Sequence, residues 1–362
     1  MAADGKLYLT EQNGTLLIVQ PSDSGARTLD LDTLTMPEGR PAELWGSVAI
    51  AHGRVYFTTE EGLYCLGNAK ASRPRPTPRP AAASAAAPAD AKAARLRVVP
   101  AELIGQAGEP VALEAWSFDA MGRFLRREKA EWSLEGLAGA ISSEGVLTTP
   151  APATTVGRIK AVAAGLQATT QARFFGPLPW SWDFESGGVP RHWIGAGPRF
   201  KLSELGGGRR LHKPPVEAGL QRATVFVGPP TLSGYTVEAQ LLAVQQGRRH
   251  GDLGVVNQGY TLDLMGKKQQ LQLRTWASEL EKSTTLPFAA QPEVWYRMKL
   301  RVEVSGDRGV ARGKVWRAGE PEPAAWTISL EDPIVIKEGA PGIYGDSATD
   351  LYWDDLTVKR NE

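Results

Sequence analysis

Apolar and polar residues alternate with a period of two along most of this chain. The pattern is clearest at residues 296–304, where apolar and charged side chains follow one another without interruption. Because successive side chains of a strand point to opposite faces, this segment is predicted to be a strand with one face in a core and the other in water. Similar segments predict strands at residues 235–242, 260–265, 271–276, 310–316 and 351–358. No segment shows the period of an amphipathic helix of three turns, so the chain is predicted to be all-β.

The first 68 residues contain a repeat. Residues 4–10 (DGKLYLT) return as residues 52–58 (HGRVYFT), and Gly14 returns as Gly62, at one shared offset of 48 residues (52 − 4 and 62 − 14). The Asn13-Gly14 pair between two apolar runs is typical of a hairpin turn, and about four strands fit into each copy. The period matches a β-propeller blade, but fewer than two blades fit, whereas a closed propeller has roughly four to eight. We therefore expect the chain to be the C-terminal part of a longer protein.

The repeat resembles that of the pyrroloquinoline-quinone-type propellers. In that family a Gly-basic-Val-Tyr strand, here residues 53–56, is followed by an acidic-Gly turn, here residues 61–62, and by a Leu-Tyr-Ala-Leu strand, here residues 63–66. The same repeat occurs in bacterial outer-membrane assembly propellers. The resemblance implies a partial β-propeller of under two blades over residues 1–68, and envelope proteins as partners. It implies no quinone site, because that cofactor binds across a complete propeller.

Residues 69–95 differ abruptly in composition from what precedes them. Proline alternates with arginine and threonine at residues 73–80, and an Ala/Pro tract follows. Alternating proline favours an extended, stiff conformation, and this segment has no apolar residues large enough to build a core. We interpret it as a spacer, with a ligand for a proline-recognition domain as the alternative.

Residues 96–175 are predicted to form a small sandwich. Evenly spaced strands are expected at residues 96–99, 111–118, 131–134, 145–149, 158–163 and 168–175, with Gly and Pro between them. The segments 131–133, 141–148 and 157–164 resemble the bacterial immunoglobulin-like repeat of the invasin and intimin type. The resemblance implies a spacer or an adhesive module.

Residues 176–362 form the largest predicted domain. They open with Trp-Asp-Phe-Glu-Ser-Gly at 182–187 and close with Leu-Tyr-Trp-Asp-Asp-Leu-Thr-Val at 351–358. This resembles the concanavalin/laminin-G-like jelly roll and the jelly-roll carbohydrate-binding modules. The resemblance implies a structural calcium ion held by Glu185, Asp354 and Asp183, since hard oxygen ligands suit that ion. The alternative is that these carboxylates are solvated at strand ends, and the sequence has no dense Asp/Asn ligand loop.

Sugar binding is the leading functional hypothesis for this domain. The chain has 11 tryptophans, which serve either in sandwich cores or as stacking platforms for sugars. Trp276 and Tyr260 are the candidate rings, and Arg274 and Asn257 are the candidate hydrogen-bonding partners. Trp276 is the preferred candidate because residues 274–278 reach a strand end, where loops on a rigid scaffold carry ligands. Core packing is the alternative for each aromatic residue.

Catalytic motifs are scarce. The Glu-x-Asp-x-Glu strand of sandwich glycosidases is absent, and the four histidines have neither metal-ligand spacing nor a serine elbow beside them. The single cysteine, Cys65, lies in an apolar strand and is predicted to be buried and inert.

Composition narrows the partners and the location. The net charge is +1 and 42% of the residues are hydrophobic, so no nucleic-acid partner is expected. No segment approaches the about 20 apolar residues of a transmembrane helix, and no signal peptide is visible. We predict a non-catalytic binding protein that is periplasmic, cell-surface or secreted and recognises carbohydrate or another surface polymer. A protein–protein scaffold of the outer-membrane assembly type is the alternative, and a fragment of a quinoprotein or glycoside-acting enzyme is the third hypothesis.

Overall fold

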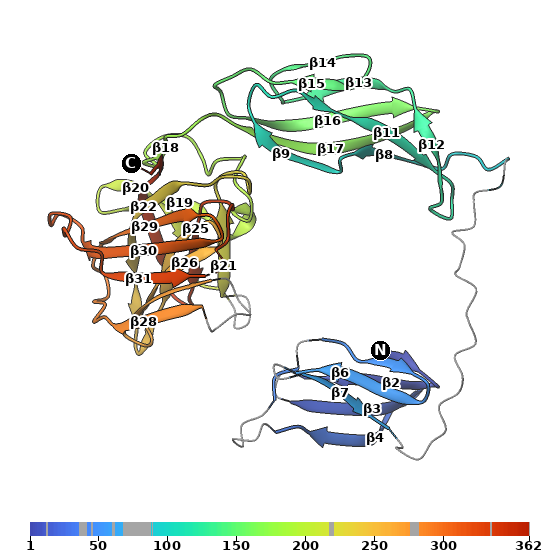
Figure 1. Ribbon diagram of the computed structural model, residues 1–362, viewed down its shortest axis with the longest axis horizontal. Helices are drawn as coiled ribbons and strands as arrows, with labels where there is room; N and C mark the ends of the chain where they lie inside the picture. The colour runs from blue at the N-terminus through green and yellow to red at the C-terminus, as the bar shows by residue number, and fades with distance from the viewer. Residues whose placement is uncertain are drawn as a thin grey trace. The chain divides into compact units, whose positions relative to one another are not determined.

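Figure 1 shows a computed structural model of the chain, which describes residues 1–11, 14–35, 42–44, 46–59, 62–67, 88, 90–216, 221–275, 282–333 and 335–361. These residues form β-strands and a short 3-10 helix, Gly197–Arg199, so the predicted all-β class is confirmed. Within the same ranges, we find no helix with the length and apolar character needed to cross a membrane. The chain divides into two compact units, Met1–Ser84 and Ala85–Glu362.

The first unit contains two small antiparallel sheets. Strands β1 to β4 pair in chain order in one sheet, and β5 to β7 pair in chain order in the other. Their bounds are β1 (Ala2–Ala3), β2 (Lys6–Thr10), β3 (Thr15–Ser22), β4 (Gly25–Thr33), β5 (Ala49–Ala51), β6 (Arg54–Thr58) and β7 (Leu63–Leu66). Tyr8, Leu16, Leu44, Val48 and Phe57 form the core. The assignment of these strands to propeller blades stays a prediction, and Asn13 of the expected hairpin turn lies outside the described residues.

Strands β4 and β7 carry large exposed apolar side chains. Every residue of β4 is exposed, including Leu31, and Leu63 on β7 is 72% exposed. The prediction that Cys65 is buried is wrong, because the structure places its side chain on the surface. β7 is the outer strand of a three-stranded sheet, and its first three residues are all exposed. An apolar sequence therefore did not imply a covered strand here.

Residues 90–175 form a sandwich of two principal sheets. One has the strand order β13-β16-β17-β9 and the other β12-β11-β8, and a short third sheet has the order β10-β15-β14. The bounds are β8 (Arg95–Val99), β9 (Glu102–Gln106), β10 (Val111–Ala112), β11 (Glu114–Phe118), β12 (Phe124–Glu128), β13 (Glu131–Glu135), β14 (Ala140–Ile141), β15 (Val146–Thr148), β16 (Thr155–Ala163) and β17 (Leu166–Phe175). Val98, Ala115, Ile159 and Phe174 from both principal sheets share one core. The immunoglobulin-like family stays a prediction, and most of the proline-rich segment before it lies outside the described residues.

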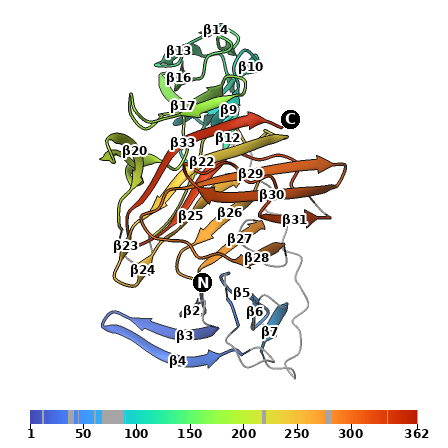
Figure 2. The ribbon, with the colours of Figure 1, turned by 90° about the vertical axis from the view of Figure 1, so that its left-hand side faces the viewer.

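The described residues from 176 to 361 form a larger sandwich of two sheets (Figures 1 and 2). The eight-stranded sheet has the order β19-β20-β33-β22-β29-β30-β31, with β18 also paired to β33. Its bounds are β18 (Trp180–Trp182), β19 (Lys201–Leu205), β20 (Gly208–Lys213), β22 (Tyr235–Ala243), β29 (Tyr296–Ser305), β30 (Arg308–Arg317), β31 (Ile328–Asp332) and β33 (Leu351–Arg360). Figure 2 shows β33, β22, β29, β30 and β31 following one another across this sheet.

The second layer of this sandwich is a six-stranded sheet with the order β21-β32-β25-β26-β27-β28. Its bounds are β21 (Arg222–Phe226), β25 (Asp252–Asn257), β26 (Tyr260–Met265), β27 (Gln270–Thr275), β28 (Ser283–Pro287) and β32 (Gly342–Asp346), and a separate two-stranded ribbon joins β23 (Gln245–Gln246) to β24 (Arg249–His250).

The core of the larger sandwich lies between its two sheets. Trp353 and Tyr235 from the eight-stranded sheet pack with Val255, Leu262 and Ile343 from the six-stranded sheet, and all five are fully buried. The predicted strand at residues 296–304 is confirmed as β29, whose residues alternate between buried and half-buried up to Glu303. This alternation leaves each sheet with an outer face of mostly polar side chains.

Candidate functional site

The outer face of the six-stranded sheet carries a group of polar side chains that includes Arg274, one of the residues predicted to bind sugar. Antiparallel pairing aligns its residues in rows across neighbouring strands. We call these residues the six-stranded face: Arg222, Thr224, Asp252, Thr261, Asp263, Gln272, Arg274, Tyr344 and Asp346. Asp252 pairs directly with Asp346, and Asp263 lies on the next strand, two residues from Met265, the residue that pairs with Asp252. Residues directly opposite each other in such a sheet have Cβ atoms about 5 Å apart, so these carboxylates lie close together.

The centre of the six-stranded face is buried although it points away from the core. Asp263 is 1% exposed, and Thr261 and Tyr344 are also buried. Asp252 and Arg274 around them are half-buried. The face therefore has a floor of desolvated polar groups and a rim that solvent reaches.

An ion pair occupies the middle of this floor. Arg274 Nη2 lies 3.2 Å from Asp263 Oδ2, and the Arg274 guanidinium carbon lies 5.3 Å from the centre of the Tyr344 ring. Burial raises the pKa of Asp263 to about 7, opposed by Arg274 and reinforced by the carboxylate of Asp252. Burial also raises the pKa of Asp252. These acids are therefore held in an environment that disfavours their charge.

Two oxygen atoms of the floor lack partners. Asp263 Oδ1 and Thr261 Oγ1 are both buried, and neither makes a hydrogen bond with any described residue. Leaving a buried polar atom unsatisfied costs about 1–3 kcal/mol, and proteins keep few of them. A ligand hydroxyl or an ordered water molecule would satisfy both atoms.

A cavity of about 400 Å³ adjoins one end of this face. Gln221, Arg249, His250, Lys267 and Ser347 are among its lining residues. The backbone N–H of Lys267 donates a hydrogen bond of 3.3 Å to Asp252 Oδ1, and Ser347 directly follows Asp346 in the chain. The cavity therefore lies next to the paired carboxylates Asp252 and Asp346.

The structure places the four residues predicted to bind sugar in different surroundings. Arg274 lies on the six-stranded face, whereas Trp276 lies outside the described residues. Tyr260 is fully buried, and its hydroxyl donates a 2.6 Å hydrogen bond to Asp332 Oδ2. Asn257 is also fully buried, and its Nδ2 donates to the carbonyl oxygens of Tyr235 and Leu300 on the opposite sheet. Tyr260 and Asn257 therefore hold the core together.

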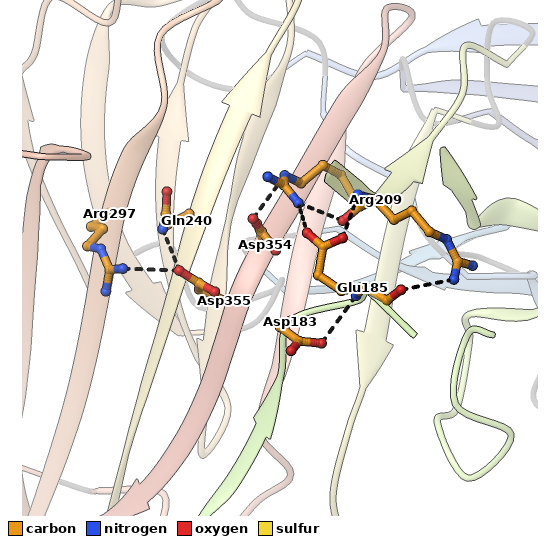
Figure 3. A network of polar contacts seen from close by, with 8 residues as sticks. Asp183, Glu185, Arg209, Gln240, Arg297, Asp354 and Asp355 are labelled. Carbon is orange, nitrogen blue, oxygen red and sulfur yellow. Dashed lines mark hydrogen bonds and ion pairs between the residues drawn. The ribbon is translucent and has the colours of Figure 1, made fainter. Parts of the chain in front are cut away.

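The three residues predicted to bind calcium lie together at the joined ends of the domain (Figure 3). Arg210 on β20 links two of them: its Nη1 lies 2.7 Å from Glu185 Oε1, and its Nε lies 2.9 Å from Asp354 Oδ2. Asp183 Oδ1 accepts a hydrogen bond of 3.1 Å from the backbone N–H of Glu185. Burial raises the pKa of Asp354 to about 6.

A guanidinium therefore already supplies the positive charge between Glu185 and Asp354. In this arrangement the residues do not fit a calcium ion, because the ion would lie against the Arg210 guanidinium, which contacts one oxygen of each acid. Asp354 Oδ1 is buried and has no partner among the described residues. Among the residues that the structure describes, no group of three or more His, Cys, Asp or Glu side chains is placed to hold a metal ion. Calcium binding stays a prediction from the resemblance.

A hydrogen-bonded chain of serine, histidine and aspartate also lies in this sandwich. His212 Nδ1 is 2.8 Å from Ser203 Oγ, and His212 Nε2 is 2.6 Å from Asp350 Oδ1. Burial lowers the pKa of His212, which stacks on Tyr352 with ring centres 4.4 Å apart. Ser203 lies inside a paired strand, unlike the nucleophile of a strained strand-to-helix turn. We interpret these hydrogen bonds as structural, because they connect β19 and β20 to the residue that precedes β33.

Sequence reasoning missed most of the six-stranded face. Within β26 the residues Tyr260, Leu262 and Leu264 face the core, so Thr261 and Asp263 must face outward. The same alternation in β25 turns Asn257 inward and Asp252 outward. The signal was therefore present in each strand, but the pairing of β25 with β32, which joins Asp252 to Asp346, is not visible in the sequence.

Comparisons with known proteins give no family assignment. No protein-family model matches the chain, and no curated protein matches it. Among solved structures it is similar to an apo Crh5 transglycosylase, at 12% identity over 51% of this chain and 85% of that chain, with a TM-score of 0.36. A Bacillus subtilis protein of unknown function with a galectin-like fold matches at 13% identity over 50% of this chain and 94% of that chain, with a TM-score of 0.32. Arcelin-5, a lectin-like defense protein from Phaseolus vulgaris, matches at 8% identity over 51% of this chain and 99% of that chain, with a TM-score of 0.32. All three TM-scores lie below 0.5, so the function proposed below rests on the residues of this chain.

Proposed function

We propose that the larger sandwich is a non-catalytic recognition domain that binds carbohydrate of a surface polymer on its six-stranded face, at the cell envelope or outside the cell. The observation that carries this proposal is the buried floor, where Asp263 Oδ1 and Thr261 Oγ1 have no partner among the described residues. A sugar hydroxyl both donates and accepts a hydrogen bond, so it can satisfy a carboxylate and a hydroxyl side by side.

The chemistry of the rim favours an uncharged saccharide. Asp252 and Asp346 offer acceptors to sugar hydroxyls, while Arg274 and Gln272 offer donors. An anionic sugar would meet three neighbouring carboxylates, of which Asp263 is paired with Arg274 and Asp346 with Arg222. Like charges at this distance repel, so we expect neutral hexose or pentose polymers to bind.

A glycan-binding screen on the full chain tests this proposal. We expect at least one neutral oligosaccharide to bind, and we expect Arg274→Ala and Asp263→Asn to weaken that binding by at least tenfold. Lys337→Ala, which changes an exposed lysine paired with Asp307 elsewhere on the domain, is the matched control and should bind as the unchanged protein does. A chelator arm tests the predicted calcium, and a Trp276→Ala arm tests the ring predicted from the sequence.

Equal binding by Arg274→Ala, Asp263→Asn and the control would contradict the proposed site. Absence of any neutral-glycan binding by the folded protein would contradict the proposed function.

A scaffold function is a second candidate, supported by the first unit. Every residue of β4 is exposed, and Leu31 and Leu63 present apolar side chains to solvent. Exposed strand edges and apolar side chains favour association with other chains. Leu31→Asp with Leu63→Asp should abolish any self-association or envelope-protein binding measured by analytical ultracentrifugation. Unchanged association in this double variant would remove the support for a scaffold.

A further inference from the structure

The outer face of the eight-stranded sheet carries a pocket of about 320 Å³. We call it the basic pocket and define it by Lys299, Arg301, Lys314, Trp326, Lys359 and Arg360, which line it together with Glu238 and Glu322. The pairing of β33, β22, β29 and β30 brings these side chains together, because Thr236 pairs with both Lys359 and Arg301 while Lys299 pairs with both Glu238 and Lys314. The pocket lies on the opposite side of the sandwich from the six-stranded face.

The side chains that line the basic pocket are positive in sum. Five lysine and arginine side chains line it with two carboxylates, an excess of three positive charges among the lining residues (5 − 2). One of the five, Arg301, is also paired with Glu303 outside the lining. The whole chain has a net charge of only +1, so the balance of the full sequence conceals this excess. A concave site lined by one sign of charge attracts ligands of the opposite sign.

The two carboxylates of the basic pocket are already engaged. Lys299 Nζ lies 3.2 Å from Glu238 Oε2 and 2.5 Å from Glu322 Oε2. Lys314 Nζ lies 2.7 Å from Glu322 Oε1, and Arg297 also pairs with Glu238. Glu238 and Glu322 therefore neutralise the lysines at the floor, where Lys314 is buried.

Lys359 and Arg360 form the positively charged rim. Both are exposed at the end of β33, and neither makes an ion pair with any described carboxylate. Lys359 pairs with the outward residue Thr236, whereas Arg360 pairs with the core residue Tyr235 and lines the pocket from the strand end. Both cations are available to an anionic group at the rim of the pocket.

Trp326 adds an aromatic surface to this charged site. Its ring is half-buried and lines the pocket, and Lys314 Nζ lies 4.8 Å from the ring centre. The lysine lies over the ring as a cation–π contact. An aromatic ring beside hydrogen-bonding groups suits the apolar side of a sugar ring.

We propose that the basic pocket binds an oxyanion-bearing sugar unit of an acidic polysaccharide, with the carboxylate or sulfate on Lys359 and Arg360 and the sugar ring against Trp326. This site is separate from the six-stranded face and does not depend on the function proposed for it. The domain then has two recognition surfaces, one for uncharged sugar and one for acidic sugar.

Titration of the full chain with three probes tests the proposal: a galacturonate oligosaccharide, a heparin-derived hexasaccharide and inorganic sulfate. The first two probes distinguish a carboxylate ligand from a sulfate ligand. We expect Lys359→Ala with Arg360→Ala to weaken binding of the preferred saccharide by at least tenfold, and we expect binding by the unchanged protein to fall as salt rises. Trp326→Ala should weaken saccharide binding several-fold and leave the weak binding of inorganic sulfate unchanged.

Two controls separate this site from general charge attraction and from the six-stranded face. Lys337→Ala removes a cation outside the pocket, and Arg274→Ala changes the other face; both should bind the acidic saccharide as the unchanged protein does. Equal losses in Lys337→Ala and in the Lys359→Ala/Arg360→Ala variant would overturn the proposal, because they would indicate non-specific attraction. Failure of the unchanged, folded protein to bind either saccharide would also overturn it.

Discussion

The two outer faces of the larger sandwich share one core, but the pKa values of their carboxyl groups are shifted in opposite directions. On the six-stranded face, burial raises the pKa of Asp263 to about 7, and the unpartnered Asp263 Oδ1 lies near other acids. On the eight-stranded face, hydrogen bonds from Lys299 and Lys314 hold the pKa of Glu322 below its usual value, although burial opposes them. The difference shows that a carboxylate can be satisfied by neighbouring lysines at the surface, as Glu322 is, or be buried with an oxygen that lacks a partner among the described residues, as Asp263 is. The second kind is the better guide to a ligand site.

The comparison also shows what strand alternation decides and what it leaves open. Alternation fixes which residues point outward from each sheet. The register between strands then decides which outward charges meet: Asp252 pairs with Asp346, while Lys299 pairs with Glu238. Like and opposite charges meet on both faces, because Asp346 also pairs with Arg222 and Lys299 also pairs with Lys314.

The largest effect is expected from a substitution in the core that both faces share. Trp353 is fully buried between the sheets, so Trp353→Ala leaves a large cavity and should destabilise the sandwich by about 3–5 kcal/mol. Chemical denaturation of the full chain measures this loss. Neutral and acidic saccharide binding should fail together at the denaturant concentration where the variant unfolds. If binding of one saccharide were lost at a clearly lower denaturant concentration than binding of the other, the two faces would not depend on one core.

A smaller effect is expected from breaking the ion pair of the six-stranded face. Arg274→Ala removes the partner of a buried carboxylate and should destabilise the protein by about 2 kcal/mol at pH 8. At pH 5 the loss should be smaller, because Asp263 is then protonated and needs no cation. Denaturation midpoints at both pH values measure the difference. A loss of the same size at pH 5 and pH 8 would contradict the placement of this carboxylate in a desolvated floor.

The raised pKa of Asp263 predicts a pH dependence of stability with a defined sign. The unfolded carboxyl ionises near its usual pKa of 3.8, whereas the folded one ionises near about 7. Between these values the folded state binds more protons, so this group's contribution to stability is complete below pH 3.8 and is lost as the pH rises to 7. Asp263→Asn should remove this fall, which we would measure as the difference between the stability–pH curves of the two proteins. Parallel curves from pH 4 to 7 would show that the pKa is not raised.

The smallest expected effect lies outside both faces. Lys337 pairs with Asp307 on an exposed part of the surface. Exposed ion pairs contribute little to stability, so Lys337→Ala should leave the denaturation midpoint unchanged within error. A clear destabilisation would show that exposed charge pairs in this domain cannot serve as neutral controls.

Much of the fold could be predicted from the sequence because alternation is a local signal. The predicted strand at residues 260–265 coincides with β26, and the unbroken pattern at 296–304 falls within β29. β25 was not predicted, because its Gly254 and two consecutive valines obscure the alternation. The exposure of Cys65 was missed because exposure depends on whether another layer covers the strand, which local residues do not encode.

The candidate site was less predictable, for two physical reasons. Tyr260 and Asn257 were chosen for their chemistry, but both are inward positions of their strands, where they satisfy buried carbonyl and carboxylate groups. Glu185 and Asp354 do lie close together, as the resemblance implied, but Arg210 lies between them. No sequence pattern connects Arg210 to the two acids, because β20 reaches them only through its pairing with β33.

Photo-crosslinking with the neutral oligosaccharide that binds best, carrying a diazirine group, tests the central claim most directly. The proposed function predicts that peptide mass spectrometry of the labelled full chain finds the crosslinks within β25, β26, β27 or β32, and that an excess of unlabelled oligosaccharide removes them. Crosslinks confined to β29, β30 and β33, or to the first unit, would contradict recognition of carbohydrate by the six-stranded face.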